Sequence, residues 1–201
     1  MKVLLETSRL VLRQFTLTDV DNLVALDSDR AVMRFINGGT PTDYEVIKER
    51  SLPKWLAYYE KYEHYGLWAS IEKSSKDFIG WFHFYPATEN TFAVELNLVS
   101  DNEIALGYRL CQSSWGKGYA TEASQALLAK GFNEWGAQKV SAWALIANKA
   151  SIRVMEKVGL QFEKEFVFTA NQLPNILAEE RQAAKYALHR ADFQRLMYSK
   201  S

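Results

Sequence analysis

The middle of the chain alternates strand-like and helix-like segments, and this succession constrains the fold more than any other feature. Ile104–Cys111 and Lys139–Ile146 alternate apolar residues with smaller or polar ones, as half-buried strands do. Tyr119–Trp135, which is dense in alanine and leucine, and Ala150–Val158 have helical patterns, and Gly159 predicts a left-handed stop for the second helix. Because each strand is followed by a helix, we expect the two strands to pair in parallel.

Further strand-like runs flank this region, and turn-forming residues separate several of them. The short polar connection Ser74–Asp77 predicts a hairpin, and a polar loop through Pro174 predicts a closing pair of strands. Together the segments predict a mixed sheet covered by helices, in which the strands up to Cys111 form a meander. The additional runs are Leu10–Phe15, Leu67–Lys73, Phe78–Tyr85, Phe92–Val99, Leu160–Thr169 and Arg181–His189.

Two helical segments are expected before the first hairpin. Thr18–Leu26 begins with Thr18 and Asp21 in the spacing of a capping box. Asp43–Glu63 is rich in glutamate, lysine, leucine and aromatic residues, which indicates a helix. Pro53 lacks a backbone N–H, so we expect it to kink that helix or divide it in two.

Composition narrows the classes of function. The 201 residues suffice for one domain with a sizeable core, so we expect a single domain over residues 1–201. With 24 basic and 24 acidic residues the chain is neutral, which favours neither nucleic acid nor an anionic membrane as partner. The lone Cys111 and three scattered histidines lack metal-ligand spacing, and one thiol suits the cytoplasm. The charged first residues do not resemble a signal peptide, and no window reaches membrane-spanning length.

The segment from Leu110 to Thr121 joins a strand to a helix through a loop that contains Gly116 and Gly118. Glycines let the backbone turn with its amides converging, and a helix N-terminus adds unsatisfied N–H groups and partial positive charge. The segment therefore predicts a pyrophosphate site, to which Lys117 can add charge. By itself, Gly-Lys-Gly is as typical of a tight solvated turn, and its spacing matches neither the P-loop nor the dinucleotide fingerprint.

Three linked motifs make this loop more specific: Leu106–Leu110 (LGYRL), Trp115–Ala123 (WGKGYATEA) and Asn148–Leu160 (NKASIRVMEKVGL). Together they resemble the GNAT superfamily of N-acetyltransferases, and most closely the branch that acetylates the N-termini of ribosomal proteins. The similarity covers nearly the whole chain. It implies an α/β fold of the mixed α+β kind, with a mostly antiparallel, strongly twisted sheet of about seven strands and helices on both faces.

The resemblance implies an enzyme that uses acetyl-CoA as cosubstrate and an amine as acceptor, acting as a monomer or homodimer. The acceptor is a protein N-terminus, a peptide or a small amine. Trp115, where relatives have glutamine or arginine, opens the pyrophosphate loop, and pantetheine pairs like an extra strand with Tyr108–Leu110, so that backbone groups bind most of the cofactor. The implied cofactor-binding residues are Tyr108, Arg109, Leu110, Trp115, Gly116, Lys117, Gly118, Tyr119, Ala120, Thr121, Asn148 and Ser151.

Asn148 and Ser151 stand at the start of the second helix of the strand–helix–strand–helix region. Asparagine is a favoured N-cap and serine is common in a first turn, so capping alone accounts for both residues. The resemblance implies, in addition, that Asn148 hydrogen-bonds pantetheine and that Ser151 protonates or hydrogen-bonds the departing thiolate. Both residues are therefore candidate catalytic groups as well as candidate caps.

The residue that accepts the proton of the amine is not defined by the motifs. Many relatives carry a glutamate two residues before the Gly-Tyr pair, where this chain has Ala105. Glu95 and Glu103 are the alternatives, directly or through water, and Glu95 is preferred, although solvated strand carboxylates are common. The missing glutamate leaves open a noncatalytic acyl-CoA-binding or sensing module. A covalent acyl-cysteine at Cys111 is not expected, because no histidine lies near it in the sequence.

Overall fold

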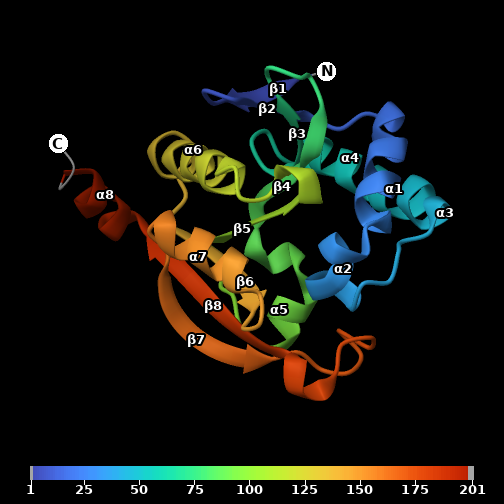
Figure 1. Cartoon of the computed structure of the whole chain (residues 1–201). Helices are drawn as coiled ribbons and strands as arrows, with labels where there is room; N and C mark the ends of the chain where they lie inside the picture. The colour runs from blue at the N-terminus through green and yellow to red at the C-terminus, as the bar shows by residue number, and fades with distance from the viewer. Residues whose placement is uncertain (1, 199–201) are drawn as a thin grey trace. The chain divides into compact units, whose positions relative to one another are not determined.

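The structure, a computed structural model, describes residues 2–198 of the chain. Eight strands within that range form one hydrogen-bonded sheet, and Figure 1 labels them along the chain. They are β1 (Val3–Glu6), β2 (Leu10–Gln14), β3 (Gly66–Glu72), β4 (Phe78–Pro86), β5 (Glu103–Leu110), β6 (Lys139–Leu145), β7 (Gln161–Val167) and β8 (Gln182–His189).

The strands follow the order β1-β2-β3-β4-β5-β6-β8-β7. β5 pairs with β6 in parallel, whereas β1 with β2, β2 with β3, β6 with β8 and β7 with β8 pair antiparallel. The mixed, mostly antiparallel sheet and the parallel pair are therefore confirmed. The sheet has one strand more than the expected seven or so, and β1, which the sequence patterns did not reveal, pairs with β2.

The helices interrupt the strands at the expected places, with two additions. They are α1 (Val20–Ser28), α2 (Arg30–Asn37), α3 (Tyr44–Val46), α4 (Leu52–Lys61), α5 (Thr91–Glu95), α6 (Tyr119–Asn133), α7 (Lys149–Lys157) and α8 (Arg190–Tyr198). The sequence patterns did not reveal α2 and α8, which are the two additions, and they predicted a strand where α5 lies. Within residues 2–198, no helix combines the length and apolar character needed to cross a bilayer.

The long helical segment is divided as Pro53 predicts. A π-helical stretch, Ile47–Ser51, separates α3 from α4, and Pro53 lies in the first turn of α4. A proline there removes no intrahelical hydrogen bond, because the first N–H groups of a helix have no helical partner. The division therefore falls directly before the proline.

Two local predictions were wrong. Phe92–Val99 is not a strand: α5 occupies Thr91–Glu95, and Asn97 then adopts a left-handed conformation with φ of 51° that turns the chain. Its apolar residues alternate, but short helical and turn segments bury Ala93 and Leu98 equally well. The capping box before α1 is Thr16–Asp19 rather than Thr18–Asp21, because Arg13 holds both Asp19 carboxylate oxygens, at 2.8 and 2.7 Å.

The described chain divides into two compact units. The first comprises the residues up to His83 together with Tyr108–Ala123, and the second comprises Phe84–Gly107 with the residues from Ser124 onward. β4, β5 and α6 each contribute to both units. The single-domain organisation over residues 1–201 stays a prediction.

The first unit packs β2, β3 and the start of β4 around buried apolar side chains, including Leu12, Phe15 and Trp68. Gly80 in β4 allows a close backbone approach to β5. Its φ is 130°, and a Cβ added there would collide with the carbonyl oxygen of Arg109 and come within 2.7 Å of the Leu110 Cα. Glycine at this position is thus required by space as well as by conformation.

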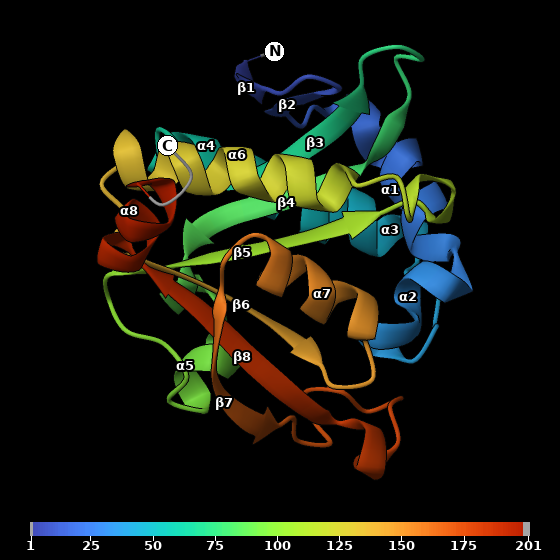
Figure 2. The ribbon, with the colours of Figure 1, turned by 60° about the vertical axis from the view of Figure 1, so that its left-hand side comes forward.

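The second unit contains β6, β7 and β8 with α7 and α8, and Figure 2 shows β7 curving beside β8. The ring of Phe132 in α6 stacks on that of Phe193 in α8 at 4.8 Å. A buried ionic cluster joins the strands: Lys185 Nζ lies 2.6 Å from a carboxylate oxygen of Glu103, and Lys139 Nζ lies 3.1 Å from the other. The cluster connects β5, β6 and β8 through side chains at the end where β5 and β6 pair.

We expect Gly80→Ala to lower the free energy of unfolding by about 3 kcal/mol, because the added methyl group must displace the β5 backbone. Gly136→Ala is the matched control, since Gly136 has a φ of 76° but open space around a built Cβ, and this variant should lose only about 1 kcal/mol. Urea unfolding of both variants measures the difference. Equal losses would contradict the close approach at Gly80.

Candidate cofactor loop and catalytic helix

The parallel pairing of β5 and β6 is short, which leaves a strand edge open. The two strands are in register only from Glu103–Lys139 to Ala105–Ser141. β6 continues to Leu145 with β8 on its other side, so in the described structure its β5-facing edge has no strand partner from Ala142 onward. Unpaired N–H and C=O groups on such an edge are natural partners for an extended, amide-containing ligand.

The end of β5 is fixed by contacts within the first unit. The Cys111 N–H donates to the Ile79 carbonyl at 2.9 Å, and the Trp115 indole Nε1–H donates to the Leu110 carbonyl, also at 2.9 Å. The ring of Tyr108 lies 5.6 Å from that of Phe82. Trp115 therefore ties the loop back to the strand from which it emerges.

The loop between β5 and α6 has the backbone expected of an anion site. Gly116 and Gly118 have φ values of 73° and 83°, and a Cβ built on Gly116 meets nothing within 4 Å. α6 begins at Tyr119, so the N–H groups of its first turn point out of the helix with no helical carbonyl to bind. Lys117 is exposed beside them. Backbone and charge here fit a pyrophosphate, and the loop offers the open space that such a group needs.

Arg9 and Glu122 brace this loop, and sequence reasoning did not find them. Arg9 donates from Nε to a Glu122 oxygen at 2.6 Å and from a second guanidinium nitrogen to the Lys117 carbonyl at 2.9 Å. Glu122 also accepts from Thr7 Oγ1 at 2.6 Å, from Ser8 Oγ at 3.0 Å and from the Arg9 N–H at 2.9 Å.

The side chain of Arg109 lies on the face of β5 opposite to that of Tyr108, because successive residues of a strand alternate between faces. Its guanidinium forms a 2.5 Å ion pair with Asp27 at the end of α1 and lies 5.1 Å above the ring of Trp81. His83, two residues along β4 from Trp81, is affected by the same charge. Loss of hydration and the Arg109 guanidinium lower the pKa of His83 to about 3, so the imidazole is neutral at physiological pH.

α7 presents its two predicted site residues in different ways. Asn148 caps the helix, with Oδ1 accepting from the Ser151 N–H at 3.2 Å, so the capping role is confirmed. Ser151 shares its side of the helix with Met155 and Val158, four and seven residues on, which are 4% and 8% exposed. Its half-buried hydroxyl therefore points along the inward side of α7, and both residues belong to the second unit.

The two candidate carboxylates differ in their surroundings. Glu95 is exposed at the end of α5, where it accepts from Gln172 Nε2 at 3.2 Å. Glu103 is 1% exposed between Lys185 and Lys139. Burial opposes its ionisation, but the ammonium groups of Lys185 and Lys139 beside it prevail and lower its pKa. A carboxylate stabilised in this way is a poor proton acceptor, which favours Glu95 over Glu103.

Cys111 has the environment of a packing residue. Burial raises the pKa of its thiol, and its Sγ lies 3.9 Å from the Phe78 carbonyl oxygen, as a weak S–H donor. A raised pKa reduces the thiolate fraction that a nucleophilic cysteine needs. Nothing in these surroundings activates it for acyl transfer.

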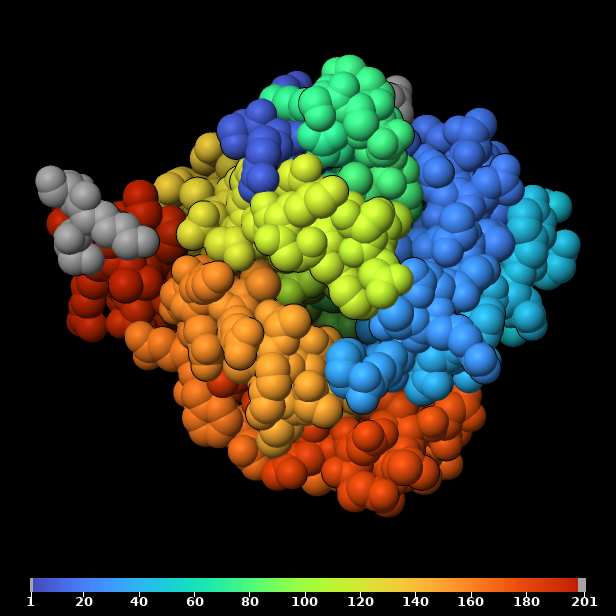
Figure 3. Space-filling model, in the orientation of Figure 1, coloured from blue at the N-terminus to red at the C-terminus, as the bar shows by residue number. Residues whose placement is uncertain are grey.

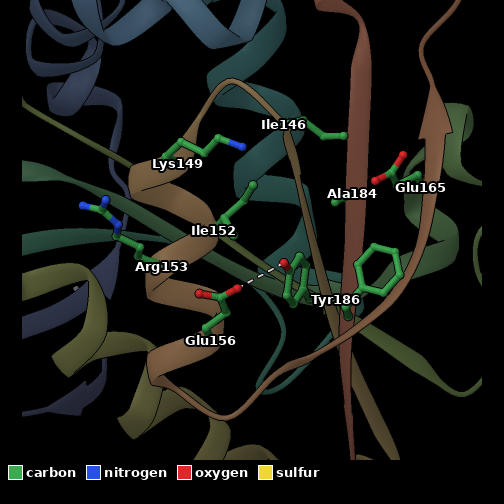
Figure 4. A pocket seen from close by; sticks show the side chains of 9 residues that line it. Ile146, Lys149, Ile152, Arg153, Glu156, Glu165, Ala184 and Tyr186 are labelled. Atoms are coloured by element: carbon green, nitrogen blue, oxygen red, sulfur yellow. Dashed lines mark hydrogen bonds between the residues drawn. The ribbon is translucent and has the colours of Figure 1, made fainter.

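A groove of about 390 Å³ lies between α7 and the strands β7 and β8, as Figure 4 shows, and Ser151 is not among its lining residues. The Tyr186 hydroxyl crosses its floor to Glu156 at 3.2 Å. Because the groove carries both Lys149 and Glu165 at its rim, its charge selects neither anions nor cations. It is lined by Ile146, Lys149, Ile152, Arg153, Glu156, Phe162, Glu165, Ala184 and Tyr186.

Comparison with known proteins identifies a family for this chain. The family model described as "Acetyltransferase (GNAT) domain" matches residues 9–161. An uncharacterised protein of Bacillus subtilis (strain 168), YkkB, is 34% identical over 146 residues, which cover 69% of this chain and 79% of that protein.

Solved structures are similar in fold. A GNAT-family acetyltransferase from Bacillus anthracis has a TM-score of 0.72 at 23% identity, with 95% of this chain and 99% of that chain covered. RimL, a ribosomal L7/L12 alpha-N-protein acetyltransferase solved with coenzyme A, has a TM-score of 0.71 at 16% identity, with coverages of 94% and 98%.

We expect the free energy of unfolding to fall as the pH drops from about 6.5 towards 3, because His83 is protonated in the unfolded state but not in the folded state over this range. The depressed pKa of His83 contributes a slope of about 1 kcal/mol per pH unit in this window. Urea unfolding at several pH values between 6.5 and 5 gives the free energy of unfolding at each pH. This free energy should change less with pH in His83→Gln than in the wild type, and His64→Gln is the surface control. Identical slopes in the wild type and His83→Gln would contradict a neutral, poorly hydrated imidazole.

Proposed function

The chain belongs to the GNAT acetyltransferase family and is an acetyl-CoA-dependent acetyltransferase; on that premise we propose that it passes the acetyl group directly to a primary amine of a protein N-terminus, a peptide or a small molecule. The observation that carries the proposal is the loop before α6, where Gly116 and Gly118 leave space in front of the free N–H groups of the helix. The family supplies the reaction, and the loop supplies a place for the cofactor.

The residues from Trp115 to Thr121 hold the pyrophosphate of the cofactor in this proposal. Backbone N–H groups of the loop and of the first turn of α6 donate to it, and exposed Lys117 adds charge. Tyr108–Leu110 offer their backbone to pantetheine. The Leu110 carbonyl accepts from the Trp115 indole, so the Trp115 side chain also fixes the direction of the strand end from which the loop emerges.

Acetyl-CoA supplies a thioester whose carbonyl the neutral amine attacks, with a thiolate as the leaving group. We assign the Ser151 hydroxyl to donate to the departing sulfur, which stabilises the charge that develops there. Asn148 uses Oδ1 as the cap, which leaves its amide N–H groups to donate to a pantetheine carbonyl. The two residues therefore serve capping and cofactor binding with different atoms.

The proton of the attacking amine goes to Glu95, through water, in this proposal. Glu103 is committed to Lys185 and Lys139, and Ala105 carries no proton acceptor, whereas Glu95 is exposed and contacts only a neutral amide in the described structure. A water chain to an exposed carboxylate suffices when the amine reaches the site with a pKa near the working pH.

The likeness to RimL supports a protein N-terminus as one candidate acceptor and leaves peptides and small amines as the others. The neutral charge of the chain favours none of the three. We also propose that the protein is a monomer or homodimer in the cytoplasm, and this part of the proposal is based on the sequence alone. The alternative is a noncatalytic acyl-CoA-binding module, and a turnover assay distinguishes it from an enzyme.

The proposal predicts thiol release from acetyl-CoA when the protein meets its amine. The assay uses a panel of peptides with free N-termini, amino acids, polyamines and aminoglycosides, and mass spectrometry to identify the acetylated product.

Gly118→Val should weaken CoA binding at least tenfold, because a branched side chain is strained at the Gly118 φ of 83° and crowds the Arg9 guanidinium, 3.4 Å from a built Cβ.

Gly136→Val is the matched control, because it places the same side chain at a similar φ, 76°, in open space of the second unit. It should bind CoA like the wild type. Tight CoA binding without thiol release across the panel would replace catalysis by a binding or sensing role. CoA binding that Gly118→Val leaves unchanged would remove the loop from the cofactor site.

Ser151→Ala should lower kcat about tenfold or more, with the Kd for CoA within twofold of the wild type, because it removes the donor to the thiolate. The substitution keeps the Ser151 N–H that Asn148 accepts, so the helix cap is retained. Ser74→Ala, in the exposed turn between β3 and β4, is the control. A kcat equal to that of the wild type would return Ser151 to a structural role.

A further inference from the structure

We propose that Arg9 is a positioning residue for the pyrophosphate loop, and that it acts by fixing the loop backbone and by neutralising Glu122. This inference rests on the proposed function, because it concerns the same cofactor site. Thr7, Ser8, Arg9 and Glu122 form what we call the hairpin clamp, in which the turn between β1 and β2 holds the start of α6. Figure 3 shows the dark-blue start of the chain against the yellow-green region that contains the loop.

Arg9 contacts the loop at three successive residues. Its guanidinium donates to the Lys117 carbonyl at 2.9 Å, lies 3.4 Å from the position of a Gly118 Cβ, and stacks 4.6 Å above the ring of Tyr119. Lys117 and Gly118 precede the first helical residue, so their conformation decides where the free N–H groups of α6 point. Arg9 therefore sets the direction of the donors that the pyrophosphate needs.

Glu122 poses an electrostatic problem that Arg9 resolves. Its carboxylate lies in the first turn of α6, one turn behind the proposed pyrophosphate, where a negative charge competes with the anion for the helix N-terminus. Partial burial opposes ionisation, but hydrogen bonds from Thr7 and Arg9 outweigh it and lower the pKa to about 2. Glu122 is thus charged whenever the enzyme works, and Arg9 is the cation that cancels it at 2.6 Å.

The two roles of Arg9 make the effects of substitutions unequal. Arg9→Ala removes the bond to the Lys117 carbonyl and exposes the Glu122 charge to the cofactor. Glu122→Gln removes that charge and leaves the Arg9 bond to Lys117 available. The double variant loses the hydrogen bond to the Lys117 carbonyl, but it also loses the repulsion between Glu122 and the cofactor. It should therefore bind the cofactor better than Arg9→Ala alone.

The experiment measures the Kd for CoA by calorimetry and the KM values for acetyl-CoA and for the amine found in the turnover assay. Arg9→Ala should raise the Kd for CoA and the KM for acetyl-CoA about tenfold, with kcat and the KM for the amine within twofold. Glu122→Gln should change the Kd less than threefold, and Arg9→Ala with Glu122→Gln should recover at least half of the lost affinity on a logarithmic scale. The Arg9→Ala effect should shrink at 0.5 M salt.

Arg195→Ala is the matched control, since it breaks an arginine–carboxylate pair, with Asp192 at 3.2 Å, on the surface of α8. If Arg9→Ala does not fold, Arg9→Lys keeps the charge, loses the forked geometry and should raise the Kd about threefold. An unchanged Kd in the Arg9 variants, or KM values that rise equally for both substrates, would overturn the inference. Absence of CoA binding in the wild type would instead refute the proposed function.

Discussion

The short parallel pairing of β5 with β6 is the constraint on which the rest of the structure depends. Parallel neighbours need a crossover, and here the crossover is the glycine loop followed by α6. The N-terminus of α6 must therefore follow directly on the end of β5. Because the register stops at Ala105–Ser141, β6 keeps an open edge. One topological choice thus supplies a helix N-terminus behind a glycine loop, which suits a phosphate group, and unpaired strand backbone, which suits an extended ligand.

Buried and half-buried charges then fix the elements that the crossover brings in. Glu103 between Lys139 and Lys185 secures the paired end of β5 and β6, Asp27 holds Arg109 near the other end of β5, and Glu122 with Arg9 secures the start of α6. Removing one member of such a pair costs more than the pair itself contributes, because an uncompensated charge remains. These carboxylates are thereby withdrawn from proton transfer. That is the physical reason why our proposal assigns the chemistry to Ser151, Asn148 and an exposed glutamate.

The sequence revealed what depends on local pattern. Strand and helix periods located seven of the eight strands, and Gly159, with a φ of 95°, ends α7 as expected. Phe92–Val99 misled because alternation over a few residues is equally compatible with a short helix followed by a turn, and the left-handed Asn97 leaves no sequence signature of its own. The hairpin clamp escaped because Arg9 and Glu122 are 113 residues apart and meet only through the tertiary fold. The acceptor amine was not identified, because no motif of the sequence concerns it.

In the complex that we propose, backbone N–H groups between Gly116 and Thr121 bind the cofactor pyrophosphate. The most direct measurement is a nitrogen–proton correlation spectrum of the ¹⁵N-labelled protein during titration with CoA. We expect saturable shifts of the amide signals of this loop, and much smaller shifts on titration with pantetheine, which lacks the pyrophosphate. Equal shifts with both ligands, or loop amides that do not respond to CoA, would contradict it.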